Sequence, residues 1–208
     1  MSDPLKSFFE DPAAYDLPTA PQKHDLLLLL RHDINICMRT CQDRRHRALF
    51  AATMLIFAGI DLLGKFLAGD DSLEPGEPRK RFKKFFEKYF QTVSQNDSEI
   101  IYQLRNALMH SFGLYSKNPR TNQEYYFDLK YAQTEGPLIR DQGNSRYWMD
   151  IRTLLNLFEA AITKYQADLR QDRSLRNNFD AMYPRYGQIW HGQEVVPPPQ
   201  TRSSDYDL

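Results

Sequence analysis

Residues 104–113 read LRNALMHSFG and hold an arginine, an asparagine and a histidine within one stretch of helical sequence. An α-helix turns by about 100° per residue, so Leu104 defines a buried stripe when it faces the core. The residues within about 60° of it on that stripe are Ile100, Ala107, Leu108 and Ser111. The opposite face carries Tyr102, Arg105, Asn106, Met109 and His110. The pattern predicts one amphipathic helix that ends near residues 112–113.

The polar face of this predicted helix lacks the Lys, Glu and Gln side chains that usually face water. It holds a single charge together with a tyrosine, a methionine, an asparagine and a histidine. We therefore expect another surface to cover it. A second copy of the same helix is an economical candidate, because a two-fold interface pairs a patch with itself. The segment 97–112 is thus the predicted homodimer contact.

Three residues on that face have chemistry that suits a phosphate group. Asn106 and His110 are four residues apart, so the amide can hydrogen-bond the imidazole and orient it. Arg105 presents a planar fork of donors that matches phosphate oxygens. A proton-carrying histidine beside such an arginine can cleave RNA without a metal, with the ribose 2′-hydroxyl as nucleophile. Arginine and histidine at this spacing also occur often by chance, so a purely structural cluster is the alternative.

Helical periodicity recurs on both sides of this segment. One helix is predicted to begin near Gln22 and to run to about residue 41. The uncharged stretch ALFAATMLIFAGI, residues 48–60, predicts a buried core helix that continues to about Ala68. Its 13 residues fall short of the roughly 18 that a membrane span needs. A long helix over 150–170 and a short one after it complete the predicted bundle.

The segment RKRFKKFFEKYFQTV, residues 79–93, combines an apolar stripe with a basic face. Its aromatic residues recur at helical spacing, at Phe82, Phe85, Phe86, Tyr89 and Phe90. Six positive charges and one negative charge lie within the stretch RKRFKKFFEK. One interpretation is a surface where Lys83, Lys84 and Lys88, together with Tyr102 of the next helix, bind RNA. The other is the ordinary solvated face of an amphipathic helix.

After residue 120 the sequence alternates between apolar and polar positions. The stretch YYFDLKY alternates in this way, and Gly143-Asn144 is a turn signal. These features predict a small β-hairpin insert of two or three short strands at about 120–150, inside a helical domain that spans 22–190. Residues 1–21 read as a proline-rich lead-in, with Phe8 and Phe9 as anchors on the domain. Residues 191–208 read as a flexible tail.

Composition limits the classes of protein that this chain can belong to. Of its 208 residues 41% are apolar, which is enough for a packed core. Lys plus Arg and Asp plus Glu each number 27, so a polyanionic partner must be met by a local patch. We find no signal peptide, cofactor motif or Cys/His metal cluster, and expect a cytoplasmic protein that does not bind a membrane. Cys37 and Cys41 read as buried thiols, with a weak metal pair or a redox pair as alternatives.

The stretch LRNALMHSFGLY resembles the motif of HEPN domains (higher eukaryote and prokaryote nucleotide-binding). In that motif an arginine, often followed by a polar residue, precedes a histidine, with four to six residues between them. Arg105, Asn106 and His110 match it. The stretches AATMLIFAGIDLLGKFLAG and FKKFFEKYF also resemble the preceding helices of bacterial HEPN-like proteins of unknown function. The likeness covers roughly residues 22–115 and continues more weakly to about residue 170.

The resemblance implies a mainly α fold, an antiparallel helical bundle that dimerises through the motif helix. Two Arg/His sets would then face each other in one composite cleft. Many members are metal-independent endoribonucleases in toxin–antitoxin, phage-defence and RNA-processing systems, so an antitoxin or regulatory protein is a candidate partner. Other members are catalytically inactive and bind nucleotide, RNA or a partner protein, which is the alternative function here.

The resemblance also implies roles for individual residues. Arg105 would hold the scissile phosphate, His110 would act as general base or acid, and Asn106 would orient His110 or bind phosphate. Asp61 and Lys65 are candidates for supporting this set, although for Asp61 the favoured interpretation is an ordinary polar residue of a helix face. Phe112 stands where one toxin branch carries a tyrosine that a partner nucleotidyltransferase modifies, so that mode of control is not expected.

Overall fold

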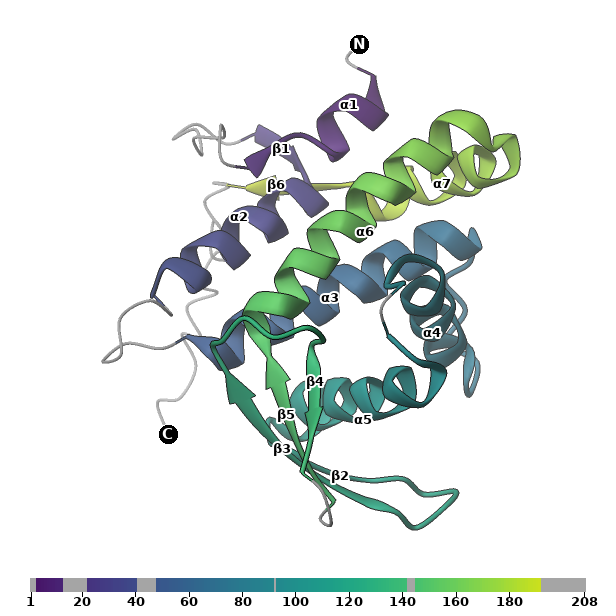
Figure 1. The fold of residues 1–208 in the computed structure, drawn as a ribbon. Helices are drawn as coiled ribbons and strands as arrows, with labels where there is room; N and C mark the ends of the chain where they lie inside the picture. The colour runs from purple at the N-terminus through teal and green to yellow at the C-terminus, as the bar shows by residue number, and fades with distance from the viewer. Residues whose placement is uncertain (1–2, 13–21, 41–47, 92, 142–144, 192–208) are drawn as a thin grey trace, which may run out of the picture.

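The computed structural model describes residues 3–12, 22–40, 48–91, 93–141 and 145–191. In this part of the chain the fold is mainly α, as predicted. Its helices are α1 (Pro4–Phe8), α2 (Leu26–Thr40), α3 (Leu49–Ala68), α4 (Glu77–Tyr89), α5 (Gln95–Ser111), α6 (Ile151–Gln171) and α7 (Arg173–Tyr186). Figure 1 shows α5 gathered with a small sheet at one end of the molecule, and α1 with α7 at the other.

Helix α3 is the centre of the bundle and contacts α2, α4, α5, α6 and α7. Within the described residues it alone is long and apolar enough to cross a membrane by length and composition, and 56% of its most apolar window is buried inside the molecule. This matches the core helix predicted from the uncharged stretch. At Gly64 an added Cβ would lie 3.1 Å from the carbonyl oxygen of Arg81, so the glycine allows α3 and α4 to approach closely.

The aromatic stripe predicted for α4 is confirmed. Its members pack into one core with α5 and α6, and the fully buried ones are Phe82, Phe85, Phe86 and Phe90. The rings of Phe86 and Phe90 stack with centroids 4.2 Å apart. Burying one such side chain stabilises the fold by about 1.5–3 kcal/mol relative to leaving it exposed. This stripe turns the opposite, basic face of α4 away from the core.

The predicted insert is a four-stranded mixed sheet rather than a single hairpin. Its strands are β2 (Tyr115–Lys117), β3 (Glu124–Lys130), β4 (Leu138–Arg140) and β5 (Arg146–Asp150), in the order β2-β3-β5-β4. The outer pairs are antiparallel, whereas β3 and β5 run parallel. Turn signals and alternation predicted strands here, but they carry no information about which strands become neighbours. The sheet also begins earlier than expected, directly after α5.

Two elements close the opposite end of the molecule. The segment predicted as the start of a helix is instead the strand β1 (Gln22–Asp25), which pairs antiparallel with β6 (Gln188–His191). The side chain of Asp25 in β1 accepts a 2.6 Å hydrogen bond from the hydroxyl of Tyr183. The lead-in forms α1, and Phe8 and Phe9 are buried as predicted. The predicted tail from residue 192 on, like Cys41, lies outside the described residues, while Cys37 is half-buried.

Candidate functional site

Helix α5 carries the Arg/Asn/His motif and is held at both ends by local hydrogen bonds. Ser94 is its N-cap, because its Oγ accepts from the backbone N–H of Asp97 at 3.1 Å. Asn96 and Asp97 lie inside the first turn. At the other end Phe112 adopts the left-handed conformation with φ 47°. The helix therefore spans Gln95–Ser111, close to the predicted 97–112.

Arg105 lies at the centre of a polar cluster that joins α3 to α5. Its Nε and Nη2 donate to Oδ2 of Asp61 at 2.9 and 2.6 Å. Its Nη1 donates to Oδ1 of Asn106 at 3.2 Å. The side chains of Arg105 and Asp61 are only 13% and 21% exposed. Asp61 is thus a direct partner of the motif arginine, which the favoured interpretation as an ordinary polar residue of a helix face did not predict.

His110 is exposed and is the outermost member of this cluster. Nη1 of Arg105 lies 3.0 Å from Nε2 of His110. A guanidinium only donates hydrogen bonds, so Nε2 accepts in this contact and the ring is neutral with its proton on Nδ1. Arg105 therefore orients the imidazole. Asn106, which was expected to do so, accepts from Arg105 and bonds to the Tyr102 hydroxyl.

Asp61 has an unusual electrostatic environment for a carboxylate. Burial raises the pKa of Asp61 above its ordinary value, and the charges of Arg105 and Lys65 lower it by less than burial raises it. Lys65, the other candidate supporting residue, has its ammonium 4.2 Å from the centre of the Tyr186 ring. Lys65 thus influences the cluster through its charge.

Tyr102 does not lie on an open RNA-binding surface. It is buried, with its ring 5.4 Å from that of Phe82 and the guanidinium carbons of Arg79 and Arg105 each 5.9 Å away. Little of Tyr102 is open to an RNA strand, because α4 covers the side of α5 that the sequence pattern left open. Ser111, placed on the buried stripe, is instead exposed.

A pocket of 440 Å³ opens beside His110. Asn106 and His110 of α5 line one side of it, together with Arg79 of α4. The residues 115–120, from β2 and the loop after it, line the other side. The strand insert therefore builds half of the candidate site. Arg105 does not line the pocket and supports it from behind.

The three lysines predicted to bind RNA do not act as one surface. Nζ of Lys83 lies 3.4 Å from Glu99 and 3.6 Å from Glu87, and Nζ of Lys88 lies 3.4 Å from Asp168. Lys84 is exposed, and the structure records no ion pair to it among the described residues. Lys83 lines a second pocket, of 310 Å³, whereas Lys84 and Lys88 line neither pocket. The charges of the basic helix are thus largely balanced by neighbouring acids.

Sequence reasoning missed the basic residues that line the same pocket as His110. Lys117 and Arg120 line its pocket from the strand insert, and Arg79 lines it from α4. Arg79 was counted only as one charge of the basic helix. Nothing in the local sequence of Lys117 or Arg120 marks them as site residues, because the pairing of β2 with β3 brings them to α5.

Comparison with known proteins adds no name to this geometry. No family model, curated protein or solved structure matched the chain. Within the described residues, no group of three or more His, Cys, Asp or Glu side chains is arranged to hold a metal ion. The function must therefore be argued from the cluster and its pocket.

Proposed function

We propose that this protein is a HEPN-like, metal-independent endoribonuclease and that His110 is its catalytic residue. The observation that carries the proposal is an exposed imidazole, oriented by a buried arginine, at the edge of a pocket lined by cations. Nε2 of the neutral imidazole can take the proton of a ribose 2′-hydroxyl when that hydroxyl replaces Nη1 of Arg105 as its hydrogen-bond partner, and the imidazolium can then give a proton to the leaving 5′-oxygen. The cations around the pocket would stabilise the charge that develops on the phosphate.

The geometry supports a positioning role for Arg105. Nε, Nη1 and Nη2 of its guanidinium already donate to Asp61, Asn106 and His110. Its buried position leaves little of it open to a substrate. Asp61 fixes one edge of the fork, and the opposite edge fixes the ring of His110. In this arrangement Arg105 keeps the catalytic ring in place, and other residues contact the phosphate.

The homodimer through α5 remains part of this proposal and rests on the resemblance. The expectation that a partner covers the whole polar face is weakened, because α4 of the same chain packs on Tyr102 and Asp61 of α3 pairs with Arg105. What stays open to a second copy is the end of the helix, where His110 and Phe112 are exposed. A two-fold contact there would bring two His110 rings toward one cleft.

The test is an RNA cleavage assay in the presence of EDTA. Wild-type protein is expected to produce fragments that end in 2′,3′-cyclic phosphate. His110→Ala is expected to lose activity by about 100- to 10,000-fold, as removal of a general acid–base group does, with an unchanged circular dichroism spectrum. His32→Ala, which removes a histidine of α2 from outside the pocket, is the matched control. Full cleavage by His110→Ala would refute the assignment.

The alternative is a catalytically inactive module that binds nucleotide, RNA or a partner protein. The observation in its favour is the closed bonding of Arg105, since a fully paired polar cluster is also a means of fixing a structure. The same assay separates the two functions. Absence of cleavage by wild type and His110→Ala alike, together with binding of an RNA strand, would favour the module.

A further inference from the structure

Two adjoining pockets on this protein are lined by cations and by no acid. The pocket of 440 Å³ that holds His110 and the pocket of 310 Å³ beside it share Arg79 and Arg120. Five basic side chains line the two together: Arg79, Lys80, Lys83, Lys117 and Arg120. No Asp or Glu is among the lining residues of either pocket. Arg79, Lys80 and Lys83 are paired with acids outside the lining. Among the described residues, Lys117 and Arg120 are therefore the cations of these pockets whose charge no ion pair balances.

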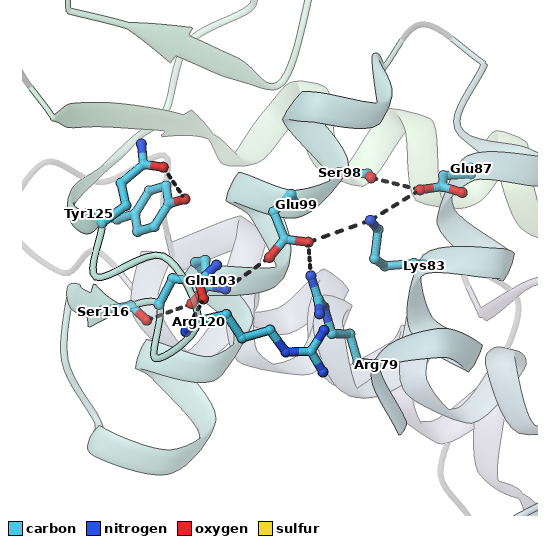
Figure 2. Close-up of polar contacts among 11 residues, drawn as sticks. Arg79, Lys83, Glu87, Ser98, Glu99, Gln103, Ser116, Arg120 and Tyr125 are labelled. Atoms are coloured by element: carbon cyan, nitrogen blue, oxygen red, sulfur yellow. Dashed lines mark hydrogen bonds and ion pairs between the residues drawn. The ribbon is translucent and has the colours of Figure 1, made fainter. Parts of the chain in front are cut away.

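The acids that balance this helix lie behind the pockets. Glu99 accepts from Nη2 of Arg79 at 2.5 Å and from the amide of Gln103 at 3.0 Å. Figure 2 shows Glu99 receiving these bonds together with that of Lys83, while Gln103 also bonds to Ser116 of β2. Glu99 therefore fixes the position of Arg79 without entering the pocket. The side chain of Arg79 stays 27% exposed and faces both pockets.

Arg120 is held in place by its loop and not by an opposite charge. It belongs to the loop between β2 and β3, and the buried residue Asn118 organises that loop. Oδ1 of Asn118 accepts from the backbone N–H of Arg120 at 2.9 Å, and its carbonyl oxygen accepts from Asn122 at 2.9 Å. None of the described residues forms an ion pair with Arg120. An ordered loop therefore presents an unbalanced guanidinium to a pocket that already contains Arg79.

We propose that Arg79 and Arg120 form a phosphate-binding subsite, which holds the RNA backbone beside the phosphate at His110. This inference rests on the proposed ribonuclease function and names how its substrate is held. Two guanidinium groups in one pocket repel each other, and an anion between them removes that repulsion. Each presents a planar fork that fits phosphate oxygens. The pocket containing His110 has the size of ordinary ligand sites, about 300–1,000 Å³, and the second continues it past Arg79.

The subsite also gives the strand insert a function. The strand β2 follows directly after α5, so the chain that leaves His110 returns as the wall opposite it. Lys117 and Arg120 both belong to this wall. A strand of RNA would then lie between α4 and α5 on one side and the insert on the other. Binding would depend on the insert even where cleavage depends on His110.

The experiment measures binding of a fluorescent single-stranded DNA oligonucleotide to the full chain as a function of salt. The DNA strand carries the same phosphates as RNA and lacks the 2′-hydroxyl, so it cannot be cleaved. Arg120→Ala is expected to weaken binding about tenfold and to lower the slope of log K against log salt by about one. Arg120→Lys keeps the charge and is expected to keep the slope. Arg170→Ala, which removes an exposed arginine of α6, is the matched control.

The outcomes separate this subsite from the proposed function. Wild-type protein that does not bind the strand, or Arg120→Ala with the affinity and salt slope of the control, would overturn the subsite. The RNA cleavage assay on wild type and His110→Ala is run beside it. Loss of salt-dependent binding in Arg120→Ala without any RNA cleavage by wild type would keep the subsite and refute the ribonuclease.

Discussion

Nη1 of Arg105 lies 3.0 Å from Nε2 of His110, and the opposite edge of the same guanidinium donates to Asp61. One buried side chain thus connects a carboxylate of α3 with the exposed imidazole of α5. Because the guanidinium only donates, it fixes both the orientation and the tautomer of the ring. The relationship makes Arg105 a positioning residue in the proposed mechanism, and that role can be tested.

Arg105→Lys is expected to lower kcat by more than it changes KM. A lysine keeps the charge but has one ammonium group, which cannot hold Asp61 and His110 in the geometry of the planar fork. We expect a loss of at least about tenfold in kcat, together with a changed pH profile of cleavage, because the ring loses its fixed donor. The measurement is steady-state cleavage across a pH series. A residue of purely structural importance would leave the shape of the pH profile as in wild type.

Asp61→Asn is expected to change how stability depends on pH. Burial raises the pKa of Asp61 above its ordinary value of 3.8, so the folded protein binds the proton more tightly than the unfolded chain does. The stability from this group is complete below the ordinary pKa and is lost as pH rises through the raised one. The amide of an asparagine does not titrate, so it contributes no such pH-dependent stability. The difference in unfolding free energy between wild type and Asp61→Asn should therefore narrow as pH rises through this window.

Urea denaturation of both proteins at several acidic pH values checks this expectation. Other carboxyl groups titrate alike in the two proteins and cancel in the difference. Asp71→Asn is the contrasting control, because the Tyr186 hydrogen bond lowers the pKa of Asp71 and reverses the sign. If the difference in unfolding free energy between wild type and Asp61→Asn stays constant with pH, then the charge of Arg105 offsets the effect of burial on the pKa of Asp61.

The helices were predictable from the sequence because their periodicity is local. The spacing of Phe82, Phe85, Phe86 and Tyr89 fixes both the helix and its buried face, and the structure has them so. The charge-free stretch of α3 likewise indicated a core helix. Asp61 was one of two candidate supporting residues, but its direct pairing with Arg105 was not predictable, since the two are 44 residues apart in the sequence.

The residues that line the pocket are brought together by tertiary contacts, which the periodicity of the sequence does not predict. The helical periodicity of α5 placed Tyr102 on the face opposite the core. In the structure α4 packs against that face and buries Tyr102. In the same way, Arg120 reaches the pocket through the β2–β3 pairing and a loop held by Asn118. The motif residues could be found from sequence, whereas the cations around them required the fold.

Glu99→Gln is expected to strengthen binding of the single-stranded oligonucleotide. Burial raises the pKa of Glu99, but hydrogen bonds from Arg79 and Gln103 outweigh it and lower the pKa, so the group is charged at neutral pH. Removing that charge leaves Arg79 without its acid partner and leaves Lys83 paired with Glu87. We expect affinity to rise about fivefold at low salt and stability to fall by about 1 kcal/mol. Glu87→Gln, which leaves Arg79 paired with Glu99, is the control.

Phe112→Gly separates the stability of the fold from the proposed dimer. Phe112 adopts φ 47° and its side chain is 73% exposed, an unfavourable backbone conformation for a bulky residue that no core contact offsets. Glycine adopts this conformation without a Cβ, and we expect it to raise the unfolding free energy by about 0.5–1 kcal/mol. If the ring packs against a second copy beside His110, the same change weakens the dimer about tenfold or more.

Sedimentation velocity over a concentration series, alongside thermal unfolding of dilute protein, measures the two effects separately. Phe112→Asn is the matched variant, because asparagine tolerates the left-handed conformation and also lacks the ring. Both variants should dissociate at higher concentration than wild type, and glycine should give the more stable monomer. Unchanged self-association of Phe112→Gly would exclude the Phe112 ring from the interface and would place the second copy, and with it the second His110, elsewhere on α5.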